Sequence, residues 1–201
     1  MGDSHAQQWA GAVLPIAEDR GWDVVALLKG GCSFAVDEAP LDGVDDCPQW
    51  REGVLGFIDK LRPSVVFGMA TKSATESAQE RVLHGLEATV DRLSKSGASV
   101  VLFRDNPRFD QNMFLCVENE GASALECRRP RETVMAAENP ASFVPGADVV
   151  DMVDFLCPVS WCLPVIGNVV VYLDHNHLTR SYARTLGPVL AAQLDASGRL
   201  G

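Results

Sequence analysis

The sequence has no apolar run close to the roughly 18 residues that a membrane-spanning helix needs, and no basic segment followed by an apolar stretch that would mark a signal peptide. It also has no internal repeat, no low-complexity tract and no linker long enough to separate two domains. Cations are scarce, because 17 Lys and Arg stand against 27 Asp and Glu and the net charge is −10. Such an acidic chain is poorly suited to a phosphate backbone, so nucleic acid is excluded as a main partner.

The cysteines include no C-x-x-C pair, the usual beginning of a zinc site, so no metal is expected. All six fall into pairs of neighbours along the chain, which are Cys32 with Cys47, Cys116 with Cys127, and Cys157 with Cys162. An even number of cysteines in or near loops favours disulfides in an oxidising compartment. Six cysteines allow about 15 connectivities, so other pairings stay open, and six free buried thiols in a cytosolic protein are the alternative. If the chain is exported, its targeting signal lies upstream.

Short apolar runs alternate with amphipathic segments along the chain. The runs predict strands at 22–29, 64–70, 98–107 and 168–177, and at the beginning of 147–157. Apolar residues at helical spacing predict helices at 6–19, 47–63, 73–97, 131–140 and 178–194. Residues 32–47 and 108–130 are predicted to be loops. Because the strand runs lack alternation, they favour a parallel sheet buried on both faces, and the fold class is α/β in a single domain over 1–201.

The first residues, MGDSHAQQW, place Ser4 directly before the first predicted helix. Amide N–H groups at a helix N-terminus favour developing negative charge, so a serine there can attack an acyl carbon while its own N–H helps to hold the oxyanion. The alternative is that Asp3 or Ser4 only caps the helix. The residues around Ser4 leave both interpretations open.

A nucleophilic serine needs a base, and YLDHNHLT near the other end of the chain offers one. Asp174 and His177 are three residues apart, a spacing that brings a carboxylate against an imidazole N–H in a helix-like turn. A capping Asp174 and an ordinary, partly buried His177 are the alternative. His175 and His5 are competing bases, although adjacent residues on a helix do not face each other, which disfavours His5.

Together, GDSH near the start and Asp174-x-x-His177 near the end resemble the SGNH hydrolase superfamily, also called GDSL esterases. The finer resemblance is to the SGNH domains fused behind membrane-embedded acyltransferase 3 domains, through GDSHAQQW (2–9), CPVSWC (157–162) and YLDHNHL (172–178). It implies a three-layer α/β/α, flavodoxin-like fold with a mostly parallel central sheet. It also implies that Ser4 is the nucleophile, His177 the base and Asp174 the carboxylate that orients the base.

The resemblance also implies an oxyanion hole that the Ser4 amide shares with two further donors. Gly68 matches a glycine that follows the second strand and gives its N–H, with a tight-turn glycine as the alternative. Asn106 in FRDNPR (103–108) matches an asparagine whose side chain donates, but the usual glycine is missing and Pro107 replaces the usual acid. An Asp105–Asn106 turn is the alternative for this position.

Three further side chains are candidates for substrate binding. Arg104 and Arg108 flank the same turn and are expected either to bind an acidic sugar or an acyl carboxylate, or to pair with the chain's many acids. Trp161 lies inside CPVSWC and is expected either to stack on a sugar ring or to pack on a disulfide as a core aromatic.

The function that the resemblance implies is O-acylation, of which O-acetylation is the simplest case, of a cell-envelope carbohydrate or glycolipid. No cofactor is expected in the domain itself, and the acyl group, from acetyl-CoA or another acyl-CoA, is expected from an N-terminal acyltransferase 3 membrane domain of the same full-length chain. The domain is then extracytoplasmic, in the periplasm or on the outer face of the cytoplasmic membrane. A secreted carbohydrate esterase and a non-catalytic glycan-binding domain are the alternatives.

The resemblance implies one more strand than the sequence shows. In this fold a central strand runs into the Gly-Asp-Ser turn, and only Met1 stands where that strand would end. We therefore expect the chain to be the C-terminal extracytoplasmic piece of a longer membrane acyltransferase.

Overall fold

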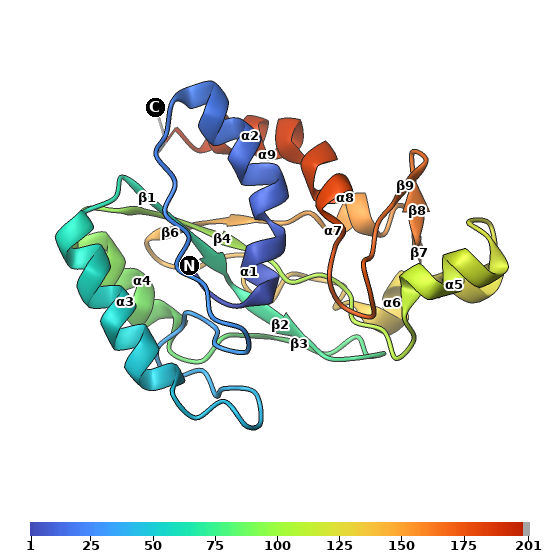
Figure 1. Cartoon of the computed structure of the whole chain (residues 1–201), viewed down its shortest axis with the longest axis horizontal. Coiled ribbons are helices and arrows are strands. Elements are labelled where there is room, and N and C mark those ends of the chain that lie inside the picture. The colour runs from blue at the N-terminus through green and yellow to red at the C-terminus, as the bar shows by residue number, and fades with distance from the viewer. Residues whose placement is uncertain (199–201) are drawn as a thin grey trace.

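The computed structural model describes residues 1–198, and a parallel three-stranded sheet lies at its centre (Figure 1). The sheet has the order β1 (Val65–Met69), β4 (Ser99–Phe103) and β6 (Ala147–Val150), with Phe67 opposite Val101 and Val101 opposite Asp148. The last four residues of β4 are at most 1% exposed. An unbroken apolar run therefore forms a strand covered on both faces, as predicted.

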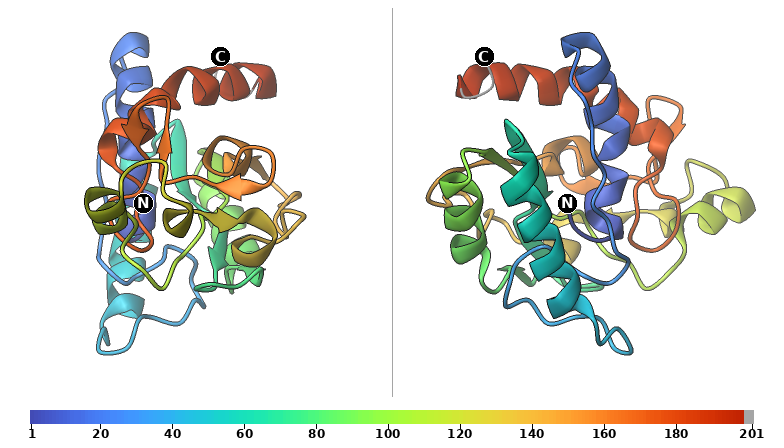
Figure 2. Two further views of the ribbon diagram at one scale, coloured as in Figure 1. Left: turned by 90° about the vertical axis from the view of Figure 1, so that its right-hand side faces the viewer. Right: turned by 60° about the vertical axis from the view of Figure 1, so that its left-hand side comes forward.

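Helices cover both faces of this sheet and make three layers (Figures 1 and 2). One layer holds α3 (Cys47–Leu61) and α4 (Leu86–Lys95), and the other holds α1 (Ser4–Gln8), α2 (Ala10–Arg20), α8 (Arg180–Thr185) and α9 (Gly187–Ser197). The buried Trp9, between α1 and α2, stacks on Phe103 of β4 with ring centroids 4.6 Å apart. The α/β/α architecture that we expected is therefore present.

Small elements surround the carboxyl ends of the strands. They are β2 (Thr71–Ser73), β3 (Glu80–Val82), α5 (Met113–Glu120), η1 (Leu125–Cys127), β5 (Arg129–Pro130), α6 (Arg131–Val134), α7 (Val153–Leu156), β7 (Trp161–Cys162), β8 (Val165–Ile166) and β9 (Val169–Val170). Within residues 1–198, no helix is both long enough and apolar enough to cross a membrane.

Two predicted strands are not strands of the sheet. Residues 22–29 form only an isolated bridge, in which Leu28 pairs in parallel with Gly2, and Val24 and Val25 are about half exposed because no strand covers their edge. Residues 168–177 give only β9, which pairs antiparallel with β8 in a small hairpin before the chain turns at Asp174.

Helix boundaries also differ from the predictions. The predicted helix 73–97 begins only at α4, because Glu80 of β3 turns inward to bond Thr71 and Arg104 and so holds this stretch as a hairpin. The helix predicted at 6–19 divides at Trp9, while Pro15 lies inside α2. The loop predicted at 108–130 contains α5 and η1, the helix at 131–140 shortens to α6, and the final helix divides into α8 and α9. The helix predicted at 47–63 is present as α3.

Three disulfides join the cysteines that are neighbours in sequence: Cys32–Cys47, Cys116–Cys127 and Cys157–Cys162. The first links the loop that precedes α3 to the first residue of that helix, and the second links α5 to η1. The predicted pairing is confirmed, and the alternative of six free thiols is wrong.

Candidate active site

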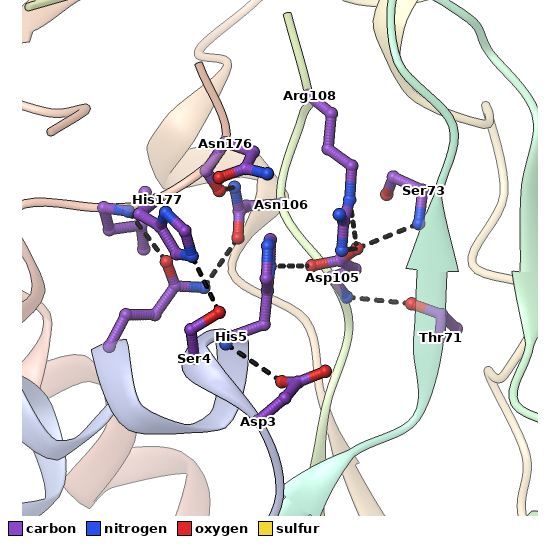
Figure 3. A network of polar contacts seen from close by, with 12 residues as sticks. Asp3, Ser4, His5, Thr71, Ser73, Asp105, Asn106, Arg108, Asn176 and His177 are labelled. Atoms are coloured by element: carbon purple, nitrogen blue, oxygen red, sulfur yellow. Dashed lines mark hydrogen bonds and ion pairs between the residues drawn. The ribbon is translucent and has the colours of Figure 1, made fainter. Parts of the chain in front are cut away.

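Ser4 is the first residue of α1, and its hydroxyl is not the cap of that helix. Asp3 caps α1, because its carboxylate accepts the backbone N–H groups of His5 at 2.9 Å and Ala6 at 3.3 Å. The Ser4 Oγ lies instead 2.8 Å from Nε2 of His177, although the two residues are 173 positions apart (Figure 3). The capping role that was left open for Asp3 or Ser4 therefore belongs to Asp3, and the Ser4 hydroxyl faces a base.

His177 is held in turn by Asp174. The distance from His177 Nδ1 to Asp174 Oδ2 is 2.8 Å, and Asp174 Oδ1 also accepts the backbone N–H groups of Asn176 and His177 at 2.8 Å. Burial raises the pKa of Asp174, but these hydrogen bonds outweigh it and hold the pKa below its ordinary value. Because an ionised carboxylate only accepts, Nδ1 carries the proton and Nε2 presents its lone pair to Ser4.

His5 belongs to a second, deeper polar cluster beside the first (Figure 3). Its Nδ1 lies 2.7 Å from Asp105 Oδ1, and Asp105 Oδ2 accepts from Arg108 Nη2 and from the Ser73 backbone N–H, both at 2.9 Å. Burial raises the pKa of Asp105, but His5, Arg108 and Ser73 outweigh it and hold the pKa well below the ordinary value. His5 is thus engaged away from Ser4, and among residues 1–198 its buried Nε2 has no hydrogen-bond partner.

His175, the other competing base, contributes its backbone rather than its ring. Its carbonyl accepts the N–H of Phe109 at 2.7 Å, and its side chain is exposed. His177 is therefore the histidine that the fold brings to Ser4.

Gly68 lies inside β1 and not after it, so its predicted place in the site is wrong. Backbone groups of alternate residues in a parallel strand face opposite neighbours. Ala70 donates its N–H to Phe103 of β4, so the backbone of Gly68, two residues earlier, also faces β4 and not Ser4. Packing explains this glycine, since a Cβ there would lie 2.9 Å from the Phe34 ring.

Asn106 is buried, and its side chain joins segments of the site instead of leaving a donor free. Its Nδ2 donates to the carbonyls of Asn176 at 2.7 Å and Pro107 at 3.0 Å. Its Oδ1 accepts from Gln8 Nε2 at 2.7 Å, and Gln8 Oε1 accepts the Leu178 N–H at 2.7 Å. We name this set, Gln8 with Asn106, the amide clamp. The expected oxyanion role of Asn106 does not fit these contacts, and the sequence reasoning missed Gln8.

The candidate substrate residues have different surroundings. Arg104 is 3% exposed and is bound by Glu80 and Asp151, so it is a structural ion pair and not a substrate-binding residue. Arg108 holds Asp105. Trp161 is 40% exposed, with the Arg128 guanidinium 4.8 Å from the centroid of its ring, so that one face of the ring is covered by a cation.

The serine, histidine and aspartate form one hydrogen-bonded chain, and Asn106, which braces it, follows the carboxyl end of β4. That arrangement on a parallel α/β sheet is typical of enzymes that pass through an acyl-serine. Within residues 1–198, no group of three or more His, Cys, Asp or Glu side chains could hold a metal ion.

Comparison with known proteins identifies the family. A family described as "SGNH domain (fused to AT3 domains)" matches residues 1–192, so the chain belongs to this family. The fold resembles a solved structure described as the periplasmic domain of a lipopolysaccharide acetyltransferase from Salmonella ser. Paratyphi A, with a TM-score of 0.67 and 16% sequence identity. That likeness covers 96% of this chain and 81% of the other. The comparison with curated proteins gives no match.

Proposed function

We propose that this domain is a serine O-acyltransferase that moves an acyl group onto a hydroxyl of a cell-envelope carbohydrate. The observation that carries the proposal is the continuous hydrogen-bonded chain from Ser4 Oγ to His177 to Asp174, with 2.8 Å at each step. Membership of a family fused to acyltransferase 3 domains supports transfer, because the fusion partner is itself an acyltransferase.

In the first half of the reaction, Ser4 Oγ attacks the acyl carbon of the donor while His177 Nε2 takes the hydroxyl proton. Asp174 stays ionised, fixes the tautomer of His177 and stabilises the imidazolium. The Ser4 backbone N–H, at the first position of α1, stabilises the tetrahedral oxyanion. When the bond to the leaving group breaks, His177 returns the proton to that group and an acyl-serine remains.

In the second half, His177 Nε2 takes the proton of an acceptor hydroxyl, whose oxygen attacks the acyl-serine. The acceptor–carbon bond forms, the Ser4 Oγ–carbon bond breaks, and Oγ regains the proton. We propose a carbohydrate or glycolipid as the acceptor and an N-terminal acyltransferase 3 membrane domain in the same full-length chain as the source of the acyl group. The domain then works outside the cytoplasmic membrane, tethered to it.

A fluorophosphonate probe and an activated acyl ester test this function directly. We expect the probe to label Ser4, and we expect Ser4→Ala to abolish both labelling and ester turnover while the melting temperature stays unchanged. Ester turnover that persists in Ser4→Ala would show that the assignment is wrong, and a folded wild-type protein without labelling or turnover would favour a non-catalytic glycan-binding domain.

Hydrolysis is the second candidate function, because the side chains of His177 and Asp174 are each 27% exposed and water can reach the acyl-serine. Incubating the activated ester with and without an envelope glycan separates the two functions. Acylated glycan supports transfer, whereas free acid alone, at every glycan concentration, supports a carbohydrate esterase.

A further inference from the structure

Hydrogen bonds join helix α1, which carries the nucleophile, to the turn 173–178, which carries the base, at two levels. At the first level, Ser4 Oγ lies 2.8 Å from Nε2 of His177. At the second, Gln8 Oε1 accepts the backbone N–H of Leu178 at 2.7 Å. Because Ser4 and Gln8 are four residues apart, both project from the same face of α1. The helix therefore contacts the base through its ring and also through its backbone.

Asn106 holds the other side of the base (Figure 3). Its Nδ2 donates to the Asn176 carbonyl at 2.7 Å, and its Oδ1 accepts from Gln8 Nε2 at 2.7 Å. Asn106 is itself buried directly after β4. The amide clamp thus bonds the backbone immediately before and immediately after His177, and its two side chains also bond each other.

The remaining bonds of the turn lead to a different part of the fold. The carbonyls of Asp174 and His175 accept the N–H groups of Met113 at 3.2 Å and Phe109 at 2.7 Å. These bonds fix the turn to the segment that follows β4, whereas the bond from Gln8 fixes it to α1. Gln8 therefore ties the backbone of the base to the helix of the nucleophile.

The two levels of contact have different fates in the proposed reaction. In the acyl-serine, Ser4 Oγ is bonded to the acyl carbon and has no hydrogen to share with His177, so the bond between their side chains is lost. The bond from Gln8 to Leu178 is made by groups that exchange no proton, so it persists. The acyl-serine is thus the state in which the base depends most on the clamp.

We infer that the amide clamp positions His177 for the second half of the reaction, in which the acceptor attacks the acyl-serine; this inference rests on the proposed function. Gln8 and Asn106 touch no reacting atom and act through the backbone of their neighbours. Before acylation, the Ser4 hydroxyl itself holds the imidazole in place, so loss of the clamp costs little there. After acylation, loss of the clamp lets the base move away from the acyl carbon, and transfer slows.

A small activated acyl ester lets the two halves of the reaction be measured separately, because the acyl-serine adds the mass of the acyl group to the protein. Rapid mixing, acid quenching and intact-mass measurement give the rate constants for its formation and for its loss. Gln8→Met keeps the approximate length of the side chain and removes both of its hydrogen bonds. The exposed Gln7, on the same helix, gives the matched control Gln7→Met.

For Gln8→Met we expect loss of the acyl-serine to slow about 10- to 100-fold, as a misplacement near 1 Å would cause, and its formation to slow less than about threefold. The acyl-serine then accumulates during turnover by the variant. Gln8→Glu, which keeps an acceptor for the Leu178 N–H, should recover part of the rate. Gln7→Met should match the wild-type protein in both steps.

Asn106→Leu removes the other half of the clamp. We expect the same selective slowing, and we expect the double variant with Gln8→Met to be no slower than the slower single variant, because the two amides act as a unit. Where Asn106→Leu does not fold, Asn106→Asp keeps the acceptor for Gln8 and gives the comparison with a smaller change. Slowing that multiplies in the double variant would show that the two amides do not form one clamp.

A merely structural role predicts a different result. Loss of folded protein lowers the amount of acyl-serine that forms, but it leaves the rate constant for its loss in the remaining folded protein unchanged. Equal slowing of both steps in Gln8→Met, no slowing of either, or a selective slowing that Gln7→Met reproduces would overturn the inference.

A measurement without substrate keeps this inference separate from the proposed function. Ser4→Ala removes the same hydrogen bond that acylation removes, so the clamp alone then joins α1 to the turn. We expect hydrogen exchange at the His177 backbone N–H to be at least about ten-fold faster in Ser4→Ala with Gln8→Met than in Ser4→Ala with Gln7→Met. If the wild-type protein forms no acyl-serine, the proposed function fails, and equal exchange in these two double variants would refute the clamp as well.

Discussion

In a protein produced from Met1 onward, the buried amino group of this residue predicts an unusual dependence of stability on pH. The amine donates to the Phe67 carbonyl in an apolar cavity of about 500 Å³ between β1 and residues 22–28, which we name the apolar slot. Burial in this slot lowers the pKa of the amine from 8.0 to about 6. Acetylation of this nitrogen removes the charge but leaves an N–H that can still donate to Phe67. The acetylated protein is therefore a matched control for the charge alone.

The size and sign of the effect follow from the two pKa values. Each pKa unit corresponds to about 1.4 kcal/mol, so a fall from 8.0 to about 6 makes the protonated amine cost about 3 kcal/mol of folding free energy. The unfolded chain binds this proton below about pH 8 and the folded chain only below about pH 6, so the unfolded state holds more protons in between. The free energy of unfolding should therefore rise from pH 6 to pH 8 and should lack this contribution below pH 6.

Urea unfolding at a series of pH values from 5 to 9 measures the effect. The histidines and carboxylates titrate in both proteins, so the difference between the acetylated and the free protein isolates the amine. We expect the free energy of unfolding of the acetylated protein minus that of the free protein to be about 2.5 kcal/mol larger at pH 5.5 than at pH 8.5. A difference that stays constant with pH would show that the amine is solvated, and the assignment of the slot as its surroundings would then be wrong.

Three further predictions follow from the polar contacts and the disulfides. Asp174→Asn should lower kcat about 10³- to 10⁴-fold without changing the fold, because an amide no longer fixes the tautomer of the base, and steady-state kinetics with an activated ester measures this. Arg104→Ala should lower the free energy of unfolding in urea by about 3–5 kcal/mol, because it leaves Glu80 buried and unpaired. Replacing both Cys32 and Cys47 by serine should cost about 3 kcal/mol in the same experiment, since their disulfide closes a loop with a sequence separation of 15.

The sequence predicted correctly those strands of the sheet whose two faces are both covered by helices of this chain. The runs at 64–70 and 98–107 became β1 and β4 because helices from both layers pack on them. The run at 22–29 is similarly rich in apolar residues, but a strand also needs a partner for its backbone, and here the slot lies beside it. The apolar composition of a run indicates that it tends to be buried. Whether its backbone pairs as a strand depends on which segments the rest of the fold places beside it.

The stretch at 73–97 shows how one buried side chain outweighs helical periodicity. Its apolar spacing suits a helix throughout, yet the side chain of Glu80 is fully buried against Arg104 and Thr71. A buried carboxylate must be paired, so the backbone around it follows the position of its partners and not its own helical tendency. Only the later part of the stretch, free of such a contact, forms α4.

For the candidate site, the sequence predicted that the serine, the histidine and the aspartate lie together. It did not predict which N–H groups are left without a hydrogen-bond partner. Ser4, Asp174 and His177 lie together as their spacing and the resemblance indicated, since each needs only one neighbour of the right kind. The oxyanion roles expected of Gly68 and Asn106 required an N–H with no partner in the folded chain, and folding satisfies nearly every buried donor.

Oxyanion donors are therefore expected among backbone N–H groups that have no partner within the folded chain. The N–H groups of the first helical turn have no partner within their own helix, and in α1 the Asp3 carboxylate takes those of His5 and Ala6. The N–H of Ser4 is the one that the cap does not take, and it belongs to the residue whose hydroxyl faces the base. The Asp3 cap thus leaves the Ser4 N–H as the free amide beside the proposed nucleophile, because its carboxylate occupies the N–H groups of the next two residues.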